Sequence, residues 1–423
     1  MLRITIHQEY GSCCDLSAKH QTSLARSSSA ASIQTLSYRS TYSPLVFFYP
    51  VDDSKHSKTA QLATQLKWSL SKTLDAIYPL SGRIELLNGF LPCQPFCQLN
   101  DPIVAPVTVQ LNVFDCGGIA LGVCLSHKLV DGTTASIFLK SWASNASGVP
   151  NNIHPNLSDA AVLFPPVDYV PQRYITNAES SWFSDCRCVT RRFGFHDKAV
   201  AALMAKGAST MVEYPTRIQA ISGFIWKHAT AASRSISGSS KPSVAKEVVN
   251  IRSRRLTKPR LSKHSIGNLI QFSMSHFNPQ HTDMEMDSLV ALLRDGVAEI
   301  NNEYIKDLTG DRGSASYFDL LNRQEEILKG NPETFMLAAW ITFGFNDIDF
   351  GWGKPIWVGV MGNTSRCIPS IPNLILLNNA GRRNGVEAWM ILDEKIMRVL
   401  ERDPEFLAYA SPNPCISSLC GDF

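Results

Sequence analysis

The sequence lacks three features that mark large classes of protein: a CxxC pair, a long apolar run and a strong excess of one charge. Its 11 cysteines are odd in number and irregularly spaced, which argues against a zinc or redox CxxC site and for free thiols in a reducing cytosol. The longest apolar run, residues 335–345, is too short to cross a bilayer, and no apolar signal-peptide core opens the chain. We therefore expect a cytoplasmic protein with no metal site and no membrane partner.

Composition and charge narrow the class further. Hydrophobic residues make 44% of the chain and charged residues 18%, which is globular, and 423 residues suit two domains of ordinary size. Forty Lys and Arg against 37 Asp and Glu leave a net charge of +3. A net charge this small argues against nucleic acid as the main partner. The sequence also has no GxSxG, P-loop, HExxH or GxGxxG motif, so the chemistries that depend on them are not indicated.

Two stretches of unusual composition divide the chain. Residues 23–43 are rich in serine and poor in acids, which predicts a loop or a disordered segment and also fits an organelle transit peptide. The proline-rich stretch 164–172 interrupts both the helical and the strand periodicity and is the best linker candidate. We expect three parts: an N-terminal domain over residues 1–164, with 1–44 atypical and partly disordered, a crossover linker over 165–182, and a C-terminal domain over 183–423.

Hydrophobic periodicity predicts both strands and helices on each side of this linker. Strands are expected at residues 44–50, 78–87, 107–114, 119–127, 246–253, 355–361, 373–378 and 386–392. Helices are expected at residues 58–77, 132–143, 199–207, 216–232, 286–308 and 394–410. The DCGG stretch at 115–118 is a hairpin-turn signal. This mixture predicts an α/β fold of two packed α/β layers.

The most informative stretch is SHKLVDG, residues 126–132. His127 closes an apolar strand, and Asp131 lies where the next helix starts. A side chain at a strand end can face a cleft on a rigid backbone, and a neutral imidazole there suits removal of a proton from an alcohol or amine. The residue types alone leave two plainer interpretations open: a core histidine with satisfied hydrogen bonds, and an aspartate that only caps the helix.

These residues also carry a resemblance to a known family. The stretch LGVCLSHKLVDG resembles the HxxxDG motif of the BAHD family of plant acyl-CoA-dependent acyltransferases, and DFGWGKP at 349–355 resembles its second signature. YPLSGR, PTRIQAISGFIWKHA, VNIRSR, SIGNLI and NGVEAWMIL keep the family's order, so the resemblance spans most of the chain from about residue 45. Residues 109–128 look closest to the alkaloid and terpenoid acetyltransferases of plant specialised metabolism.

The resemblance implies two chloramphenicol-acetyltransferase-like domains, each a mixed β-sheet flanked by helices, with a tunnel at their interface. Coenzyme A enters at one mouth and the acceptor at the other, and both reach His127. The imidazole acts as general base on the acceptor hydroxyl and then protonates the departing thiolate. The implied activity is O-acylation of a small-molecule alcohol, with acetyl-CoA as co-substrate, by a monomer that holds no permanent cofactor.

The resemblance also implies roles for supporting residues. Asp131 pairs with Arg252 and turns away from His127, which makes it structural. Trp340 corresponds to a tryptophan that faces the developing oxyanion, although Ala338 stands where the family usually has threonine. The residues of the second motif are structural and support the channel for coenzyme A: Asp349, Phe350, Gly351, Trp352 and Gly353.

The basic run at residues 241–264 allows two interpretations. It forms a solvated surface, as runs of charge usually do. Alternatively, Arg254, Arg255 or Lys258 contacts the 3′-phosphate and pyrophosphate of coenzyme A. No aromatic residues interleave the charges as nucleic-acid binding would favour.

The chain departs from the family pattern in two places. The serine-rich segment replaces the usual N-terminal LSxLDQ-like block, and after residues 88–90 the chain omits about 30 residues that commonly form two strands of ordinary length. Loss of two strands exposes pairing edges and part of a core, which keeps a second class open: a non-catalytic or poorly folding relative. An N-acyltransferase, which differs only in the acceptor, is a third.

Overall fold

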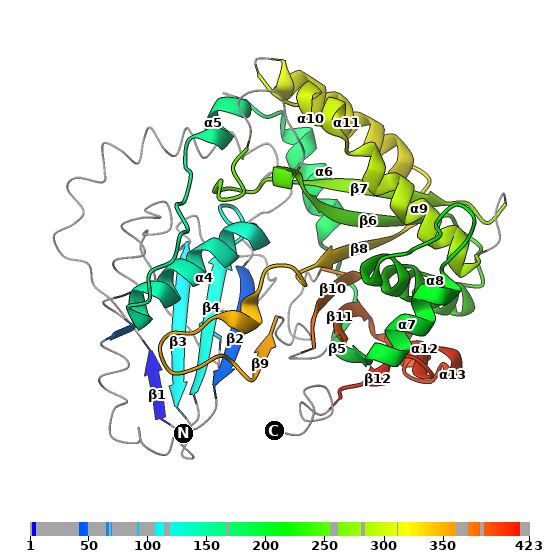
Figure 1. The fold of residues 1–423 in the computed structure, drawn as a ribbon. Coiled ribbons are helices and arrows are strands. Elements are labelled where there is room, and N and C mark those ends of the chain that lie inside the picture. The colour runs from blue at the N-terminus through cyan, green and yellow to red at the C-terminus, as the bar shows by residue number, and fades with distance from the viewer. Residues whose placement is uncertain are drawn as a thin grey trace.

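Two β-sheets organise the chain, with helix α4 on the first sheet and a group of helices on the second (Figure 1). The computed structural model describes residues 2–5, 42–49, 65, 66, 69, 91, 92, 106–113, 119–165, 169–253, 261–280, 284–310, 312–360, 371–380 and 385–414. The predicted helix at 58–77, apart from three of its residues, the predicted strand at 78–87 and the predicted turn at 115–118 lie outside these ranges. The predicted two-sheet α/β fold is confirmed.

The first sheet has the strand order β1-β3-β4-β2-β9, and its described pairings are antiparallel. Its strands are β1 Leu2–Thr5, β2 Tyr42–Tyr49, β3 Val107–Val113, β4 Ile119–Ser126 and β9 Trp357–Gly359. Strands β3 and β4 pair from Val107 opposite Leu125 to Val113 opposite Ile119, as the sequence predicted. Strand β9 comes from much later in the chain and pairs with β2, so the second half of the chain supplies one edge of the first sheet.

Helix α4, Gly132–Ser147, follows β4 after a short turn and packs on the first sheet. Its predicted apolar stripe is buried, with Ala135, Phe138 and Trp142 each no more than 5% exposed. Gly148 ends the helix in the left-handed conformation at a φ of 73°, which glycine adopts without steric cost. The helix therefore begins shortly after His127 and runs across the first sheet.

The second sheet is mixed, with the order β12-β5-β11-β10-β8-β6-β7 and parallel pairing of β8 with both β6 and β10. Its strands are β5 Cys188–Phe195, β6 Ser243–Asn250, β7 Ile270–Phe277, β8 Glu333–Ala339, β10 Leu374–Asn379, β11 Val386–Asp393 and β12 Ser411–Pro412. One face packs against the helices α7 Asp197–Lys206, α8 Arg217–Ser237, α9 Met286–Glu299 and α12 Glu394–Leu400. The remaining α-helices of the described ranges are α5 Asp159–Leu163, α6 Gln172–Trp182, α10 Asn302–Asp307, α11 Gly313–Leu328 and α13 Pro404–Leu407.

Two predicted helices are wrong in length because each is interrupted. The helix expected over 286–308 divides into α9 and α10, where the side chain of Asn301 accepts hydrogen bonds from the backbone N–H groups of Glu303 and Tyr304 and starts a new helix. The helix expected over 394–410 divides into α12 and α13, because Asp403 caps a new first turn that begins with Pro404. In both cases a local cap overrides a continuous apolar pattern.

The other face of the second sheet shares a hydrophobic cluster with the first sheet and α4. Leu374, Leu376 and Ile391 of the second sheet belong to the same cluster as Phe47 of β2 and Trp142 of α4. A polar contact accompanies it, because the carboxylate of Glu387 on β11 accepts from the indole N–H of Trp357 on β9 at 3.1 and 3.2 Å. The division of the chain into an N-terminal domain over 1–164, a linker over 165–182 and a C-terminal domain over 183–423 stays a prediction.

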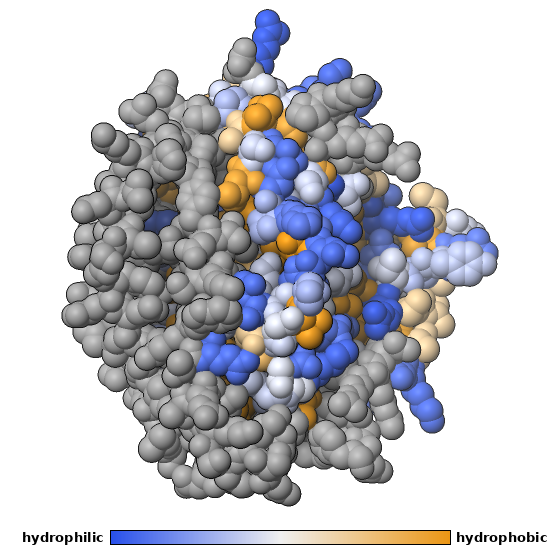
Figure 2. All heavy atoms as spheres, turned by 60° about the vertical axis from the view of Figure 1, so that its left-hand side comes forward, coloured by the Kyte–Doolittle hydropathy of each residue, from blue (hydrophilic) through white to orange (hydrophobic). Residues whose placement is uncertain are grey.

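The described surface is mixed in character. Figure 2 shows hydrophilic and hydrophobic residues interleaved on the described part of one face. Across the described ranges, no helix combines the length and the apolar composition that a bilayer crossing requires. Within the same ranges, no cluster of His, Cys, Asp or Glu side chains is arranged to hold a metal ion.

Candidate active site

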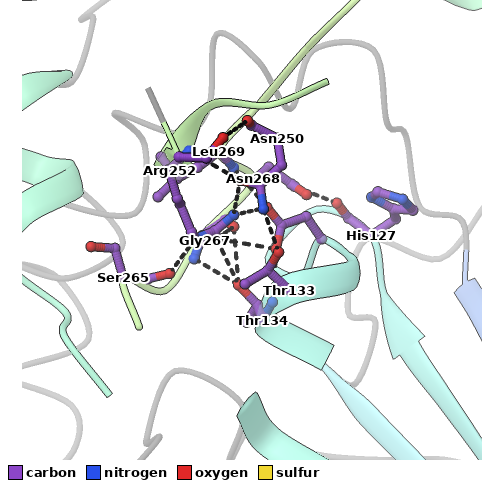
Figure 3. Close-up of polar contacts among 11 residues, drawn as sticks. His127, Thr133, Thr134, Asn250, Arg252, Ser265, Gly267, Asn268 and Leu269 are labelled. Atoms are coloured by element: carbon purple, nitrogen blue, oxygen red, sulfur yellow. Dashed lines mark hydrogen bonds and ion pairs between the residues drawn. The ribbon is translucent and has the colours of Figure 1, made fainter. Parts of the chain in front are cut away.

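His127 is the first residue after β4, at the start of the turn that leads into α4. The side-chain Nδ2 of Asn268 donates a hydrogen bond to the backbone carbonyl of His127 at 2.5 Å. Figure 3 shows the imidazole directed away from Arg252 and the polar network around it. The histidine backbone is therefore fixed by a residue 141 positions later in the chain, while its ring lies on the opposite side.

The surroundings of His127 keep its imidazole neutral. Burial lowers the pKa of His127 below its ordinary value. A backbone hydrogen bond, the charge of Asp131 and a hydrogen bond with the side chain of Asn268 oppose that effect without reversing it. A neutral imidazole at pH 7 can accept a proton, as a general base must.

Asp131 and Arg252 form a buried, two-pronged ion pair. Arg252 Nη1 lies 2.6 Å from Asp131 Oδ2, and Nη2 lies 3.1 Å from Oδ1, with both side chains only 2% exposed. The same carboxylate accepts from the backbone N–H of Thr134 at 2.8 Å, as the N-cap of α4, and from that of Leu269 at 3.0 Å. The carboxylate thus accepts four hydrogen bonds, and these hold the loop in place.

The remaining donors of Arg252 join three segments of the chain. Its Nε donates to the carbonyl of Ser265 and its Nη2 to that of Gly267, both at 2.8 Å. Beside it, Asn250 at the end of β6 donates to the hydroxyl of Thr133 at 2.9 Å. Figure 3 shows this network between the end of β6, the loop at 265–269 and the start of α4. The contacts position the loop that carries Asn268.

Trp340 follows β8 and lies among aromatic residues that reach the start of α4. Its ring packs against Phe343 and Phe345 at centroid distances of 6.3 and 5.7 Å. The Phe343 carbonyl accepts from the Ser136 hydroxyl at 2.7 Å, and its ring occupies the space beside Gly132. Within the described part of the chain, no group accepts from the indole N–H of Trp340.

The second motif forms a tight loop at the opposite end of α4. Asp349 Oδ1 accepts from the backbone N–H groups of Gly351 and Gly353 at 2.8 and 2.9 Å, and both glycines have a φ near +100°. Phe350 is fully buried and meets Trp142 edge-to-face at 4.8 Å. The ring of Trp352 stacks on Phe350 at 5.4 Å.

The position of this loop separates it from the chemistry. A Cβ on Gly351 would lie 3.3 Å from the Cα of Ser147, the last residue of α4, whereas His127 lies before the first residue of that helix. A helix of 16 residues is about 24 Å long. The loop therefore packs against the far end of α4 and does not contact His127.

The structure groups some of the predicted site residues and leaves others undescribed. His127, Asp131 and Arg252 meet around one loop, whereas Arg254, Arg255 and Lys258 lie outside the described residues. The sequence reasoning assigned no role to Asn268, although it lies in the SIGNLI stretch. The amide side chain among the apolar residues of that segment was the only local signal, and it does not reveal a partner so far away in the sequence.

Comparisons with known proteins agree on one family. The model of the Transferase family matches residues 87–407. Limonoid 7-O-acetyltransferase from Citrus sinensis is 32% identical and aligns over 88% of this chain and 92% of its own length. Akuammiline synthase 2 from Alstonia scholaris is 31% identical over 89% of this chain and 91% of its own. The crystal structure of vinorine synthase superposes with a TM-score of 0.70 at 26% identity, covering 89% of this chain and 92% of that one.

Proposed function

The chain belongs to the Transferase family, and from that premise we propose that it moves an acetyl group from acetyl-CoA to a hydroxyl of a plant specialised metabolite. Members of the family include acetyltransferases of alkaloids and terpenoids. The chain is an acyltransferase. The observation that carries the proposal is the difference between two residues that follow β4. The imidazole of His127 is neutral, whereas the carboxylate of Asp131 is paired with the guanidinium of Arg252.

In the proposed reaction, the imidazole of His127 takes the proton of the acceptor hydroxyl while its oxygen attacks the thioester carbonyl carbon. A carbon–oxygen bond forms, the carbon–sulfur bond breaks, and the imidazolium returns the proton to the leaving thiolate of coenzyme A. Such positioned proton transfer contributes about 10²–10⁴-fold to the rate. Because burial already favours the neutral ring, the base is ready at pH 7 without an aspartate partner.

Trp340 is the proposed donor to the oxyanion. Its indole N–H has no acceptor among the described residues, and its ring is held by Phe343 and Phe345. One well-placed donor of this kind stabilises a transition state by about 2.7–4 kcal/mol. Ala338 offers no hydroxyl two residues earlier, so Trp340 acts without help from that position.

The remaining features of the proposal concern binding. Arg254, Arg255 and Lys258 contact the phosphates of coenzyme A, and the enzyme acts as a cytoplasmic monomer without a permanent cofactor. The loop at 349–353 packs against the end of α4, supports the channel for coenzyme A and takes no part in proton transfer. These roles follow from the family resemblance and from the placement of the loop at the far end of α4.

The test measures release of free coenzyme A thiol. Purified protein is incubated with acetyl-CoA and a panel of hydroxylated terpenoids and alkaloids, and products are identified by mass spectrometry. We expect acceptor-dependent thiol release that His127→Ala reduces by about 10²–10⁴-fold while its melting curve stays close to that of the wild type. Near-normal turnover by His127→Ala would refute the mechanism, and a folded protein with no turnover on any acceptor or donor would favour the non-catalytic alternative. Malonyl-CoA, hexanoyl-CoA and benzoyl-CoA in the same assay identify the donor.

A further inference from the structure

Lys246 is a half-buried lysine in the middle of β6, with β7 on one side and β8 on the other. It lies opposite Met274 of β7 and opposite Met336 of β8. Directly opposed residues share a face and contact each other through their side chains. The lysine therefore stands between two methionines, and neither of these directly opposed residues carries a charge that compensates it.

The alternation of side chains along β6 shows which way Lys246 faces. Lys246 is on the same face as Asn250, because the two residues are four apart on one strand. Asn250 contacts Thr133 at the start of α4, and Met336 packs against the cluster formed by α4 and the first sheet. Lys246 thus lies on the face of the second sheet that looks toward α4 and the first sheet, and not on the face that α8 and α9 cover.

The charge of Lys246 has no partner within the described structure. Burial lowers the pKa of Lys246 to about 8, and no carboxylate of the described residues acts on it. The amine is therefore still largely protonated at pH 7. Partly removing an unpaired ammonium from water is unfavourable, and an anion supplied by a ligand would offset that cost.

The position of Lys246 relative to His127 limits which part of a substrate reaches it. Asn250 lies about 13 Å farther along β6, and it is there that the strand meets the start of α4 and the loop that holds His127. An acetyl group in contact with the imidazole does not reach Lys246. Only an acceptor that spans at least this length can place one end at the imidazole and the other beside Lys246.

We propose that Lys246 binds a carboxylate at the end of the acceptor remote from the reacting hydroxyl, and that it selects acidic acceptors over acceptors with a protonated amine. The inference rests on the proposed function, because it assumes that the acceptor lies between the two sheets. The same positive charge repels a basic alkaloid. Opposite and like charges a few ångströms apart near a protein surface differ enough in energy to change relative affinity at least tenfold.

The experiment uses three sterol probes that share one skeleton and two hydroxyl groups. They are deoxycholate, its neutral methyl ester and the corresponding 24-amine, each below its critical micelle concentration. Isothermal titration calorimetry at pH 7 measures binding to the wild type, Lys246→Met and Lys246→Arg. We expect the wild type to bind the acid at least tenfold more tightly than the ester and the amine most weakly. Lys246→Met abolishes this order, and Lys246→Arg retains it.

Lys241→Met, which removes an exposed lysine just before β6, is the matched control and keeps the wild-type order. Equal affinity of the wild type for the acid and the ester, or an order that survives in Lys246→Met, would overturn the proposal. The same titration with malonyl-CoA is a further check. If Lys246→Met weakened the binding of malonyl-CoA alone, the proposal would also be overturned, because the carboxylate would then belong to the donor. Binding does not require turnover, so failure to acetylate any alcohol would count against the proposed function alone.

Discussion

The carboxylate of Asp131 points to the guanidinium of Arg252, 2.6 Å away and 121 residues later in the chain, although Asp131 lies only four residues after His127. The two residues of the HxxxD motif therefore serve different ends. His127 presents a neutral ring, whereas Asp131 ties the start of α4 to the end of β6 and to the 265–269 loop. A substitution at each position has a different expected consequence.

We expect Asp131→Asn to destabilise the fold. Removing one partner of a buried ion pair leaves the other charge uncompensated and costs about 3–5 kcal/mol. Denaturant melting of the wild type and the variant measures the loss. The matched control is Arg398→Ala, which breaks the exposed pair with Glu394 and costs less than about 1 kcal/mol. Equal losses in the two variants would show that the buried pair has no special weight.

The rate should depend on pH through His127. Because burial lowers the pKa of this imidazole, the acid limb of kcat/KM should be centred below about pH 6.5, the ordinary histidine value. A thiol-release assay from pH 4.5 to 8 measures the profile. His154→Ala, which removes an exposed histidine, should leave it unchanged. An acid limb centred above 6.5 would contradict the neutral, buried base.

Asn268 should act as a positioning residue for His127. Its side chain holds the His127 carbonyl and also raises the pKa of the ring. Asn268→Ala should therefore reduce kcat about tenfold, through the loss of hydrogen bonds worth about 1 kcal/mol each, and move the acid limb to lower pH. Asn268→Asp adds a negative charge beside the imidazole and should move the limb to higher pH. A reduced rate with the same acid limb in both variants would indicate a purely structural role.

Short-range patterns predicted the elements that frame the site. The alternation in residues 107–127 gave both strands of the hairpin, and the spacing of Ala135, Phe138 and Trp142 gave the buried stripe of α4. Local capping was harder to foresee, because the side chain of Asn301 ends an apolar pattern that continues without a break.

Contacts between distant segments were not predictable from periodicity. Nothing in residues 355–361 indicates that β9 pairs with β2, and nothing in residues 265–270 indicates that Asn268 reaches His127. The partial burial of Lys246 likewise depends on which strands adjoin β6. The pairing of Asp131 with Arg252 entered through the family resemblance, and the geometry now supplies its physical basis.

The last prediction concerns Gly132, the glycine of the HxxxDG stretch. A Cβ at this position would lie 2.2 Å from Cε2 of Phe343, well inside contact distance. Gly132→Ala must therefore displace the Phe343 ring, and overpacking of this kind typically costs about 1–3 kcal/mol. Because Phe343 packs against Trp340, the proposed oxyanion donor, we also expect kcat to fall. Thermal melting and thiol release measure the two effects.

A double-mutant cycle separates the collision from a general effect of the added methyl group. Phe343→Leu shortens the side chain that Gly132→Ala would strike, so the double variant should be more stable than the sum of the single changes predicts. Gly330→Ala, at a glycine where an added methyl group would have no described heavy atom within 4 Å, should change neither stability nor rate appreciably. If Gly132→Ala matched Gly330→Ala in both measurements, the Phe343 ring would not be the obstacle, and Trp340 would not be positioned through it.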